Sequence, residues 1–190
     1  MNRILGLVAA AAVALSSGMA IADNYDETVQ RFKESGQSAD FFKNSYGYAV
    51  FPNIGKAGFG VGGAHGKGKV YKQGKYVGES AVTELSVGFQ AGGQAYSQII
   101  FFEDQRAYDE FTSGEFEFGA GVNAVAITAS AGAEAGSTGK STSVSAGKND
   151  AKTKGEYRKG MAVFTVVKGG AMYEASLAGQ KYKFKPIDDK

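Results

Sequence analysis

A group of lysines lies in a short glycine-rich stretch, and together these residues could bind an oxyanion. No acidic residue stands between the first lysine and the last. Backbone N–H groups in glycine-rich turns can face an anion, and each lysine near an anionic surface contributes about 1 kcal/mol. The pattern predicts a surface for phosphate head groups, with an ordinary solubilising hairpin as the alternative. The candidates are Lys56, Lys67, Lys69, Lys72 and Lys75, with Phe59 as an apolar contact for acyl chains.

The residues that most enzymes use are scarce in this chain. It has one histidine, His65, and no cysteine, which excludes a cysteine nucleophile. A zinc site would need carboxylates around a single imidazole. No G-x-S-x-G motif occurs. Because His65 stands among glycines, an exposed loop is its expected place, and we expect no catalytic residue, metal or cofactor.

Two glycine patterns match nucleotide-binding motifs only in part. Gly58, Gly60 and Gly63 fit G-x-G-x-x-G, but that fingerprint needs a helix after it, whereas residues 67–77 have the pattern of turn and strand. The run G-A-H-G-K-G-K that begins at Gly63 resembles a phosphate loop. Val70, however, stands where a magnesium-binding Ser or Thr is required. No βαβ alternation supports either pattern, so we expect no nucleotide.

Residues 1–22 have the pattern of a signal peptide, although a buried core helix is the alternative. Arg3 precedes an apolar run, Ile4 to Leu15, that is too short to span a bilayer. Ala20-Ile21-Ala22 fits a small-x-small cleavage site, so cleavage before Asp23 is expected. Gly18-Met19-Ala20 is the other option for the cleavage site. The expected location is therefore the periplasm or the exterior, with peripheral association with a membrane.

Composition limits what the processed chain could bind. Loss of Arg3 would lower the formal net charge from +2 to +1, so bulk nucleic-acid binding is not expected. Export implies an oxidising compartment, yet no disulfide can form without cysteine, and the core must stabilise the fold alone. With 190 residues, the chain has room for one main domain. We assign a helical segment to residues 23–45 and this domain to residues 46–190.

Two or three short helices are expected. In residues 23–35, Tyr25, Val29 and Phe32 share one helical face, and Asp23 or Asn24 could cap it. This helix and a short one that begins at Ser38 would form an amphipathic lid or a membrane-touching arm, or would pack on the domain itself. The expected ranges are 23–35, 38–42 and 103–111.

The rest of the chain favours strands. Gln73-Gly74 predicts a hairpin turn, and Pro52-Asn53 predicts another turn. Gly92-Gly93 predicts a turn or a sharp bend. In the alternating run 82–91, Leu85 and Glu84 are expected to face opposite ways. The apolar residues 99–102 are typical of a strand buried on both faces. Further expected strands are residues 48–51, 69–71, 75–77, 82–91, 115–129, 142–146, 161–167 and 171–177, with loops at 132–140 and 148–159. A flexible surface segment is the alternative for residues 115–147, and a ligand site is the alternative for residues 148–159.

The last predicted strand alternates Lys181, Lys183 and Lys185 with Tyr182 and Phe184, as on a guarded edge strand. The same row of lysines could instead meet anionic lipid. Glycine at high density within strand-like sequence indicates bulges, bends and close backbone approach. Together these patterns predict an α+β domain with a mostly antiparallel sheet, either strongly bent or closed into a barrel-like sandwich.

Five blocks of the sequence stand in an order and at a spacing that match a known family: AVFPNIGKAGFGVGGAHGKG (49–68), SVGFQAGGQAYSQIIFF (86–102), EDQRAYDEF (103–111), FEFGAGVNAVAI (116–127) and GMAVFTVVKGGAMYEASLAGQKY (160–182). Together they resemble the SYLF family. The family's eukaryotic members bind phosphoinositides and, in yeast, actin, and its bacterial members usually carry a signal peptide. The resemblance implies lipid binding without catalysis, and Lys56 matches the basic position of the family's K-A-G-F motif.

The resemblance also bears on the lipid and on other partners. Residues 23–44 correspond loosely to the family's N-terminal amphipathic segment. Residues 130–133 lack the proline that the family often has in its small-residue region, and the eukaryotic partner domains are missing. For an exported chain of bacterial type, the resemblance implies an anionic phospholipid rather than a phosphoinositide, and no actin. The protein partner stays unidentified.

The sequence thus predicts an exported, non-catalytic protein that engages anionic phospholipid head groups through a basic glycine-rich loop. A small outer-membrane β-barrel is one alternative, because glycine-rich alternating strands with many Tyr and Phe fit it. The charged residues Asp188-Asp189-Lys190 argue against it. A structural or stress-related protein-interaction module without a lipid ligand is the other alternative.

Overall fold

The computed structural model describes residues 24–119, 124–127, 155–169 and 179–187. These residues form three helices and a six-stranded sheet whose pairs are antiparallel, except for one parallel pair, β4 with β5. The predicted α+β class and mostly antiparallel sheet are confirmed. The elements are α1 (Tyr25–Glu34), α2 (Phe41–Asn44), β1 (Gly47–Lys72), β2 (Lys75–Phe102), α3 (Gln105–Thr112), β3 (Glu115–Glu117), β4 (Val125–Ile127), β5 (Met161–Gly169) and β6 (Gln180–Pro186).

Two long antiparallel strands, β1 and β2, dominate the fold. Between them, Gln73 and Gly74 have φ angles of 48° and 78°. A type I′ turn requires positive φ at both central residues, and its twist matches that of the flanking strands. The predicted hairpin is confirmed, but its strands are far longer than the short segments expected from the sequence.

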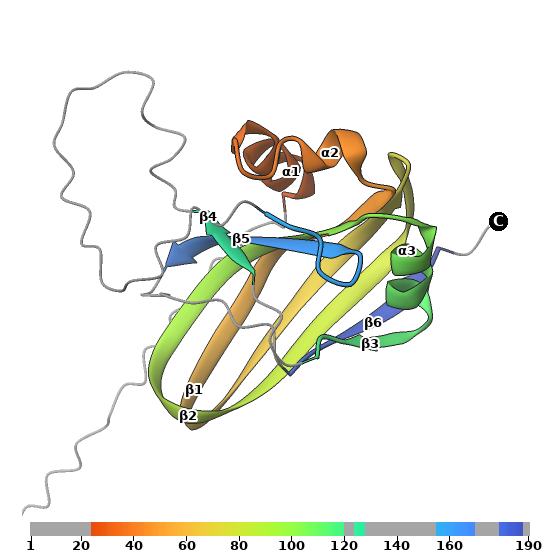
Figure 1. The fold of residues 1–190 in the computed structure, drawn as a ribbon. Coiled ribbons are helices and arrows are strands. Elements are labelled where there is room, and N and C mark those ends of the chain that lie inside the picture. Colours follow the sequence, from red (N-terminus) through yellow and green to blue (C-terminus); the bar gives the residue numbers. More distant parts are fainter. Residues whose placement is uncertain (1–23, 120–123, 128–154, 170–178, 188–190) are drawn as a thin grey trace, which may run out of the picture.

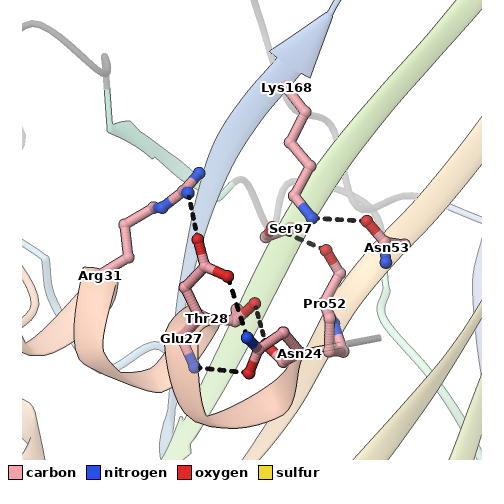
Figure 2. Close-up of polar contacts among 8 residues, drawn as sticks. All are labelled: Asn24, Glu27, Thr28, Arg31, Pro52, Asn53, Ser97 and Lys168. Atoms are coloured by element: carbon pink, nitrogen blue, oxygen red, sulfur yellow. Dashed lines mark hydrogen bonds and ion pairs between the residues drawn. The ribbon is translucent and has the colours of Figure 1, made fainter. Parts of the chain in front are cut away.

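The expected turn at Pro52-Asn53 is wrong, because β1 continues through it. One residue of β2, Ser97, stands between the partners of Phe51 and Ile54, so β1 has an extra residue here. Proline cannot donate to a strand ladder and is tolerated at such a bulge. Figure 2 shows how side chains stabilise it: Ser97 Oγ donates to the Pro52 carbonyl at 2.7 Å, and Lys168 donates to Asn53 Oδ1.

Both long strands bend sharply near their middle (Figure 1). Gly58 pairs with Gly92 and Gly60 pairs with Gly88, so β2 has two more residues than β1 in this interval. Extra residues in one strand of a pair bend it and increase its twist. Gly92-Gly93 therefore lies next to a bend in β2, where the chain does not reverse. Figure 1 shows the strongly bent sheet that the sequence predicted.

Beyond the bend, the second half of β1 lies against the first half. A Cβ atom at Gly68 would stand 2.5 Å from the Phe51 ring and 2.8 Å from the Val50 carbonyl oxygen, and one at Gly66 would stand 2.8 Å from the Asn53 carbonyl oxygen. These glycines permit the close backbone approach that the glycine-rich sequence predicted.

Strand β2 is the centre of the sheet. Residues 95–102 pair with β5 and residues 78–84 with β6, while β1 pairs along the other edge. In the described part of the chain the order is β3-β6-β2-β5-β4, with β1 on β2.

The predicted edge strand, β6, lies between β2 and β3, so its assignment as an edge was wrong. The alternation of its side chains is confirmed, because Tyr182 is buried while Lys181 and Lys183 are exposed. These two lysines form cross-strand ion pairs with Glu117 and Glu115 of β3, at 3.5 and 2.8 Å. The lysine row therefore faces acidic side chains of a neighbouring strand.

Hydrophobic side chains pack on both faces of the sheet. The inner face, inside the bend, carries Phe51, Ile100, Phe102 and Tyr182 and is covered by Phe111 of α3. On the outer face, α1 and α2 cover a second cluster that contains Val50, Ile99, Phe101, Phe164 and, from α1, Phe32. Residues 99–102 are fully buried, which confirms the strand buried on both faces.

The three predicted helices are confirmed within a few residues. Asn24 Oδ1 caps α1 by accepting from Glu27 N at 3.1 Å (Figure 2), and Asp104 Oδ1 caps α3 by accepting from Ala107 N at 2.8 Å. Ser38 does not cap α2 and instead donates to the Phe32 carbonyl at 2.6 Å. In this structure α1 and α2 pack on the domain itself, the second of the two expected arrangements.

Several predicted segments lie outside the described residues: the signal peptide, the loop at 132–140, and the strands at 142–146 and 171–177. Within the expected strand 115–129, the described residues form two short strands, β3 and β4.

Candidate functional site

The six predicted site residues do not form one site. Lys67, Lys69 and Lys72 lie near the end of β1, and Lys75 begins β2, so these four share the end of the hairpin. We call residues 67–77 the hairpin end. Phe59 lies in the bend, at the other end of this half of β1, and its side chain is not among those described. Lys56 lies at the inner face, paired with Glu84.

At the hairpin end, lysine ammonium groups lie over tyrosine rings. Lys69 Nζ is 4.4 Å from the ring centroid of Tyr25 in α1 and 5.4 Å from that of Tyr76. Tyr71 stacks on Tyr48 with a centroid distance of 4.9 Å and lies beside Tyr76. These rings are partly exposed. Cation–π attraction orients the ammonium, and tyrosine offers an apolar body with a polar tip, as at membrane interfaces.

Lys72 points toward α3 rather than α1. Its Nζ lies 5.4 Å from the Tyr46 ring centroid and 5.2 Å from that of Tyr108. A hydrogen bond with Tyr46 raises the pKa of Lys72, so the ammonium is charged at neutral pH. Lys67 and Lys75 are exposed. The hairpin end therefore presents positive charge on both of its sides.

A cluster of polar side chains lies on the inner face next to the bend. Lys56 Nζ is 2.6 Å from Glu84 Oε1, and their side chains are only 18% and 6% exposed. Gln180 Nε2 donates to Glu84 Oε2 at 3.2 Å and to Tyr96 Oη at 3.0 Å. Tyr182 donates to Gln180 Oε1, and Gln98 Nε2 donates to Tyr182 Oη at 2.8 Å. We call these residues the inner polar cluster: Lys56, Glu84, Tyr96, Gln98, Gln180 and Tyr182.

The ion pair of this cluster joins the two halves of the bent sheet. In the strand register Lys56 is opposite Gln94 and Glu84 is opposite Ala64, so the two residues are not cross-strand neighbours. The predicted alternation of Glu84 and Leu85 is confirmed. The outcome is nevertheless unusual, because the charged residue Glu84 is buried whereas the apolar residue Leu85 is 76% exposed.

Sequence comparison gives the family. Residues 83–186 match the Ysc84 family model, described as "Las17-binding protein actin regulator", which is more than half of the chain. The chain belongs to this family, the SYLF family. It is similar to Beta cell expansion factor A of Aeromonas veronii, with 28% identity over 158 residues, 81% of this chain and 51% of that protein. The chain thus spans about half the length of the curated relative it matches.

Membership of the SYLF family suggests a role in lipid binding or a role related to actin regulators, and the matched family is not known as an enzyme family. The matched region contains every member of the inner polar cluster except Lys56 and lies wholly outside the hairpin end. No helix in the described ranges is long and apolar enough to cross a membrane.

His65 and the two nucleotide-like glycine patterns of this SYLF domain all lie within one strand, β1. His65 is exposed as expected, but it lies in β1 rather than in a loop. The glycines of both nucleotide-like patterns also lie inside β1. The element that follows β1 is the strand β2, not the helix that a nucleotide-binding motif requires. Among the described residues, no group of three or more His, Asp or Glu side chains could hold a metal ion.

Two polar atoms on the inner face, one of them within the inner polar cluster, are buried without a hydrogen-bond partner. They are Gln98 Oε1 and Thr165 Oγ1. Gln98 and Thr165 are directly opposite on β2 and β5, and such pairs share one face of a sheet. Both residues are fully buried. The inner face therefore has hydrogen-bonding capacity beyond what the cluster uses.

Two half-buried tyrosines should make this domain less stable at high pH. Burial raises the pKa of Tyr48 and of Tyr157 to about 12, whereas tyrosine in an unfolded chain ionises near pH 10. The folded state therefore retains its phenol protons longer. The stability that these two tyrosines contribute should be constant below pH 10 and should be lost as the pH rises from 10 towards 12. Urea unfolding at pH 9 and pH 11 checks this.

The matched control for this prediction is Tyr157→Phe. The Tyr157 hydroxyl has no hydrogen-bond partner, so its removal should cost little at pH 9 and should reduce the loss of stability at pH 11. Equal free energies of unfolding at the two pH values would contradict the prediction.

Proposed function

We propose that this SYLF domain is an exported, non-catalytic protein that binds anionic phospholipid head groups at a membrane surface. The observation that carries the proposal is the gathering of lysines and partly exposed tyrosine rings at the hairpin end. Lys69 lies over Tyr25 and Tyr76, so a charged group and amphipathic rings are held together. Family membership supports a lipid as the ligand.

Among the predicted lysines, the charge distribution favours those of the hairpin end over Lys56. Lys67 and Lys75 are exposed, and an exposed ammonium keeps its full attraction to an anionic surface, about 1 kcal/mol each. Lys56 is paired with Glu84, so its charge is already compensated. The proposed contact residues are therefore Lys67, Lys69, Lys72 and Lys75, with Tyr25 and Tyr76 at the level of the head groups.

The export part of the proposal rests on residues 1–22. Their positive start, apolar run and small-x-small site fit a signal peptide. Cleavage before Asp23 would leave α1, and with it Tyr25, close to the new N-terminus. The processed domain would act in the periplasm or outside the cell, peripheral to a membrane.

Co-sedimentation with vesicles tests the proposal. Mass spectrometry first establishes the N-terminus of the processed protein. The protein is then mixed with phosphatidylcholine vesicles that contain or lack phosphatidylglycerol, at low and at high salt. We expect binding only to the anionic vesicles, and weaker binding at high salt because exposed charges are screened. The variant Lys67→Gln/Lys75→Gln should bind about thirtyfold more weakly, since two ammonium groups contribute about 2 kcal/mol.

The matched control is Lys33→Gln/Lys159→Gln, which loses the same charge from exposed positions outside the hairpin end. It should bind nearly as well as the natural protein. Equal losses in the two variants would show that only net charge matters. Failure to bind either kind of vesicle would overturn the proposal and favour a protein-interaction role, which the family description also names.

A further inference from the structure

The Glu84 carboxylate occupies a small oxyanion site on the inner face. Each of its oxygens receives a donor: Lys56 Nζ lies 2.6 Å from Oε1, and Gln180 Nε2 lies 3.2 Å from Oε2. One ammonium and one amide N–H are thus arranged around two oxygens that share one negative charge. The two unesterified oxygens of a phosphodiester carry the same charge and accept the same kinds of hydrogen bond.

The donor Gln180 is held in place by its neighbours. Its amide also donates to Tyr96 Oη, and its carbonyl accepts from Tyr182, which in turn accepts from Gln98. Gln180 is 2% exposed and Tyr182 is fully buried. Because these side chains are fixed by one another and not by Glu84 alone, the donor would keep its direction if the carboxylate moved away.

The placement of Glu84 runs against the ordinary pattern of a strand. An inward Leu85 and an outward Glu84 would bury an apolar side chain and solvate a charge, yet the structure has the reverse. Burying an ion pair costs desolvation that its attraction does not always offset. Residues whose placement opposes stability in this way are concentrated at functional sites of proteins.

Of the two charged side chains at the site, Lys56 is the more exposed to water. The Lys56 side chain is 18% exposed, three times the exposure of Glu84, so an anion would meet the ammonium first. Gln98 Oε1 and Thr165 Oγ1, both unpartnered, extend the polar face and could bond hydroxyl groups next to a phosphodiester.

We propose that Lys56 and Gln180 form a second anion site, for the phosphodiester of a hydroxyl-bearing head group, and that Glu84 closes this site until its carboxylate is displaced. The choice of ligand rests on the proposed function. The site itself shares no residue with the hairpin end, so the two can fail separately.

The variant Glu84→Gln tests the proposal, because it removes the competing charge and keeps one acceptor oxygen in place of the two that bond Lys56 and Gln180. Binding to phosphatidylglycerol vesicles should become roughly fivefold tighter, the effect of one more available lysine. Glu156→Gln changes the net charge equally at an exposed position and should not tighten binding. Lys56→Gln/Glu84→Gln should return to the affinity of the natural protein. Circular dichroism and a cooperative melting curve establish that each variant is folded.

Two further arms complete the experiment. A water-soluble glycerol phosphodiester, titrated into Glu84→Gln, distinguishes a free phosphate ester from a lipid: competition with the vesicles supports the site and a soluble ligand, and binding to vesicles alone supports the site and a lipid. In the natural protein, bicelles with phosphatidylglycerol should shift the NMR signal of the Lys56 ε-methylene, and bicelles without it should not.

A gain with Glu84→Gln no larger than that with Glu156→Gln would overturn the proposal, as would a gain that persists when Lys56 is also replaced. An unchanged Lys56 signal in the natural protein would overturn it without any variant. If any of these results is obtained while the natural protein still binds vesicles through Lys67 and Lys75, the proposed function stands and only the second site fails.

Discussion

Replacing Glu84 by alanine should lower the free energy of unfolding by about 3 kcal/mol. Removing one member of a buried ion pair leaves the other charge uncompensated, which costs about 3–5 kcal/mol. The lower end applies because the Lys56 side chain keeps 18% of its exposure to water. Gln180 also loses one of its two acceptors. Urea unfolding of the variant and of the natural protein measures the difference.

The matched control replaces both charges. Lys56→Met with Glu84→Gln leaves no buried charge and keeps an acceptor for Gln180, so most of the stability should return. This outcome would show that the loss in Glu84→Ala comes from the uncompensated ammonium. If Glu84→Ala were as stable as the natural protein, the ion pair across the bent sheet would contribute nothing in solution.

Replacing Gly68 by alanine should also cost about 3 kcal/mol, the upper end for overpacking a core. The new Cβ atom would stand 2.5 Å from the Phe51 ring and 2.8 Å from the Val50 carbonyl oxygen. The ring is fully buried, and the carbonyl belongs to a paired strand, so neither can move away freely. Urea unfolding again gives the magnitude.

Gly55→Ala is the control for this variant. It lies in the same strand, and a Cβ atom there meets nothing within 4 Å. Alanine restricts the unfolded chain more than glycine does, so this change should raise stability by about 0.5 kcal/mol. Equal effects at the two positions would mean that the halves of β1 are not closely packed.

Local patterns in the sequence were sufficient for the features that depend on neighbouring residues. The Gln73-Gly74 turn, the cap of α1 by Asn24 and the opposite facing of Glu84 and Leu85 each follow from a few adjacent residues, and all are confirmed. The double burial of residues 99–102 was likewise evident from a continuous apolar run.

Features that depend on the bend could not be predicted in the same way. Lys56 looked like part of a basic surface because its partner, Glu84, is 28 residues away and approaches only when the sheet bends back. The alternation at Glu84 was visible, but no neighbouring residue indicates which face is buried. Pro52-Asn53 reads as a turn locally, and the side chains that stabilise it as a bulge, Ser97 and Lys168, come from distant strands.

The central position of β2 has a consequence for the order of folding. The β1–β2 hairpin needs only a two-residue turn, but Glu84 of β2 pairs with Gln180, 96 residues later. At ordinary rates of synthesis this interval takes roughly 5–20 seconds. During that time the edge of β2 at residues 78–84 has no strand on it, and open edges recruit other chains. Slowing or truncating the chain before residue 180 should therefore promote aggregation rather than a smaller folded domain.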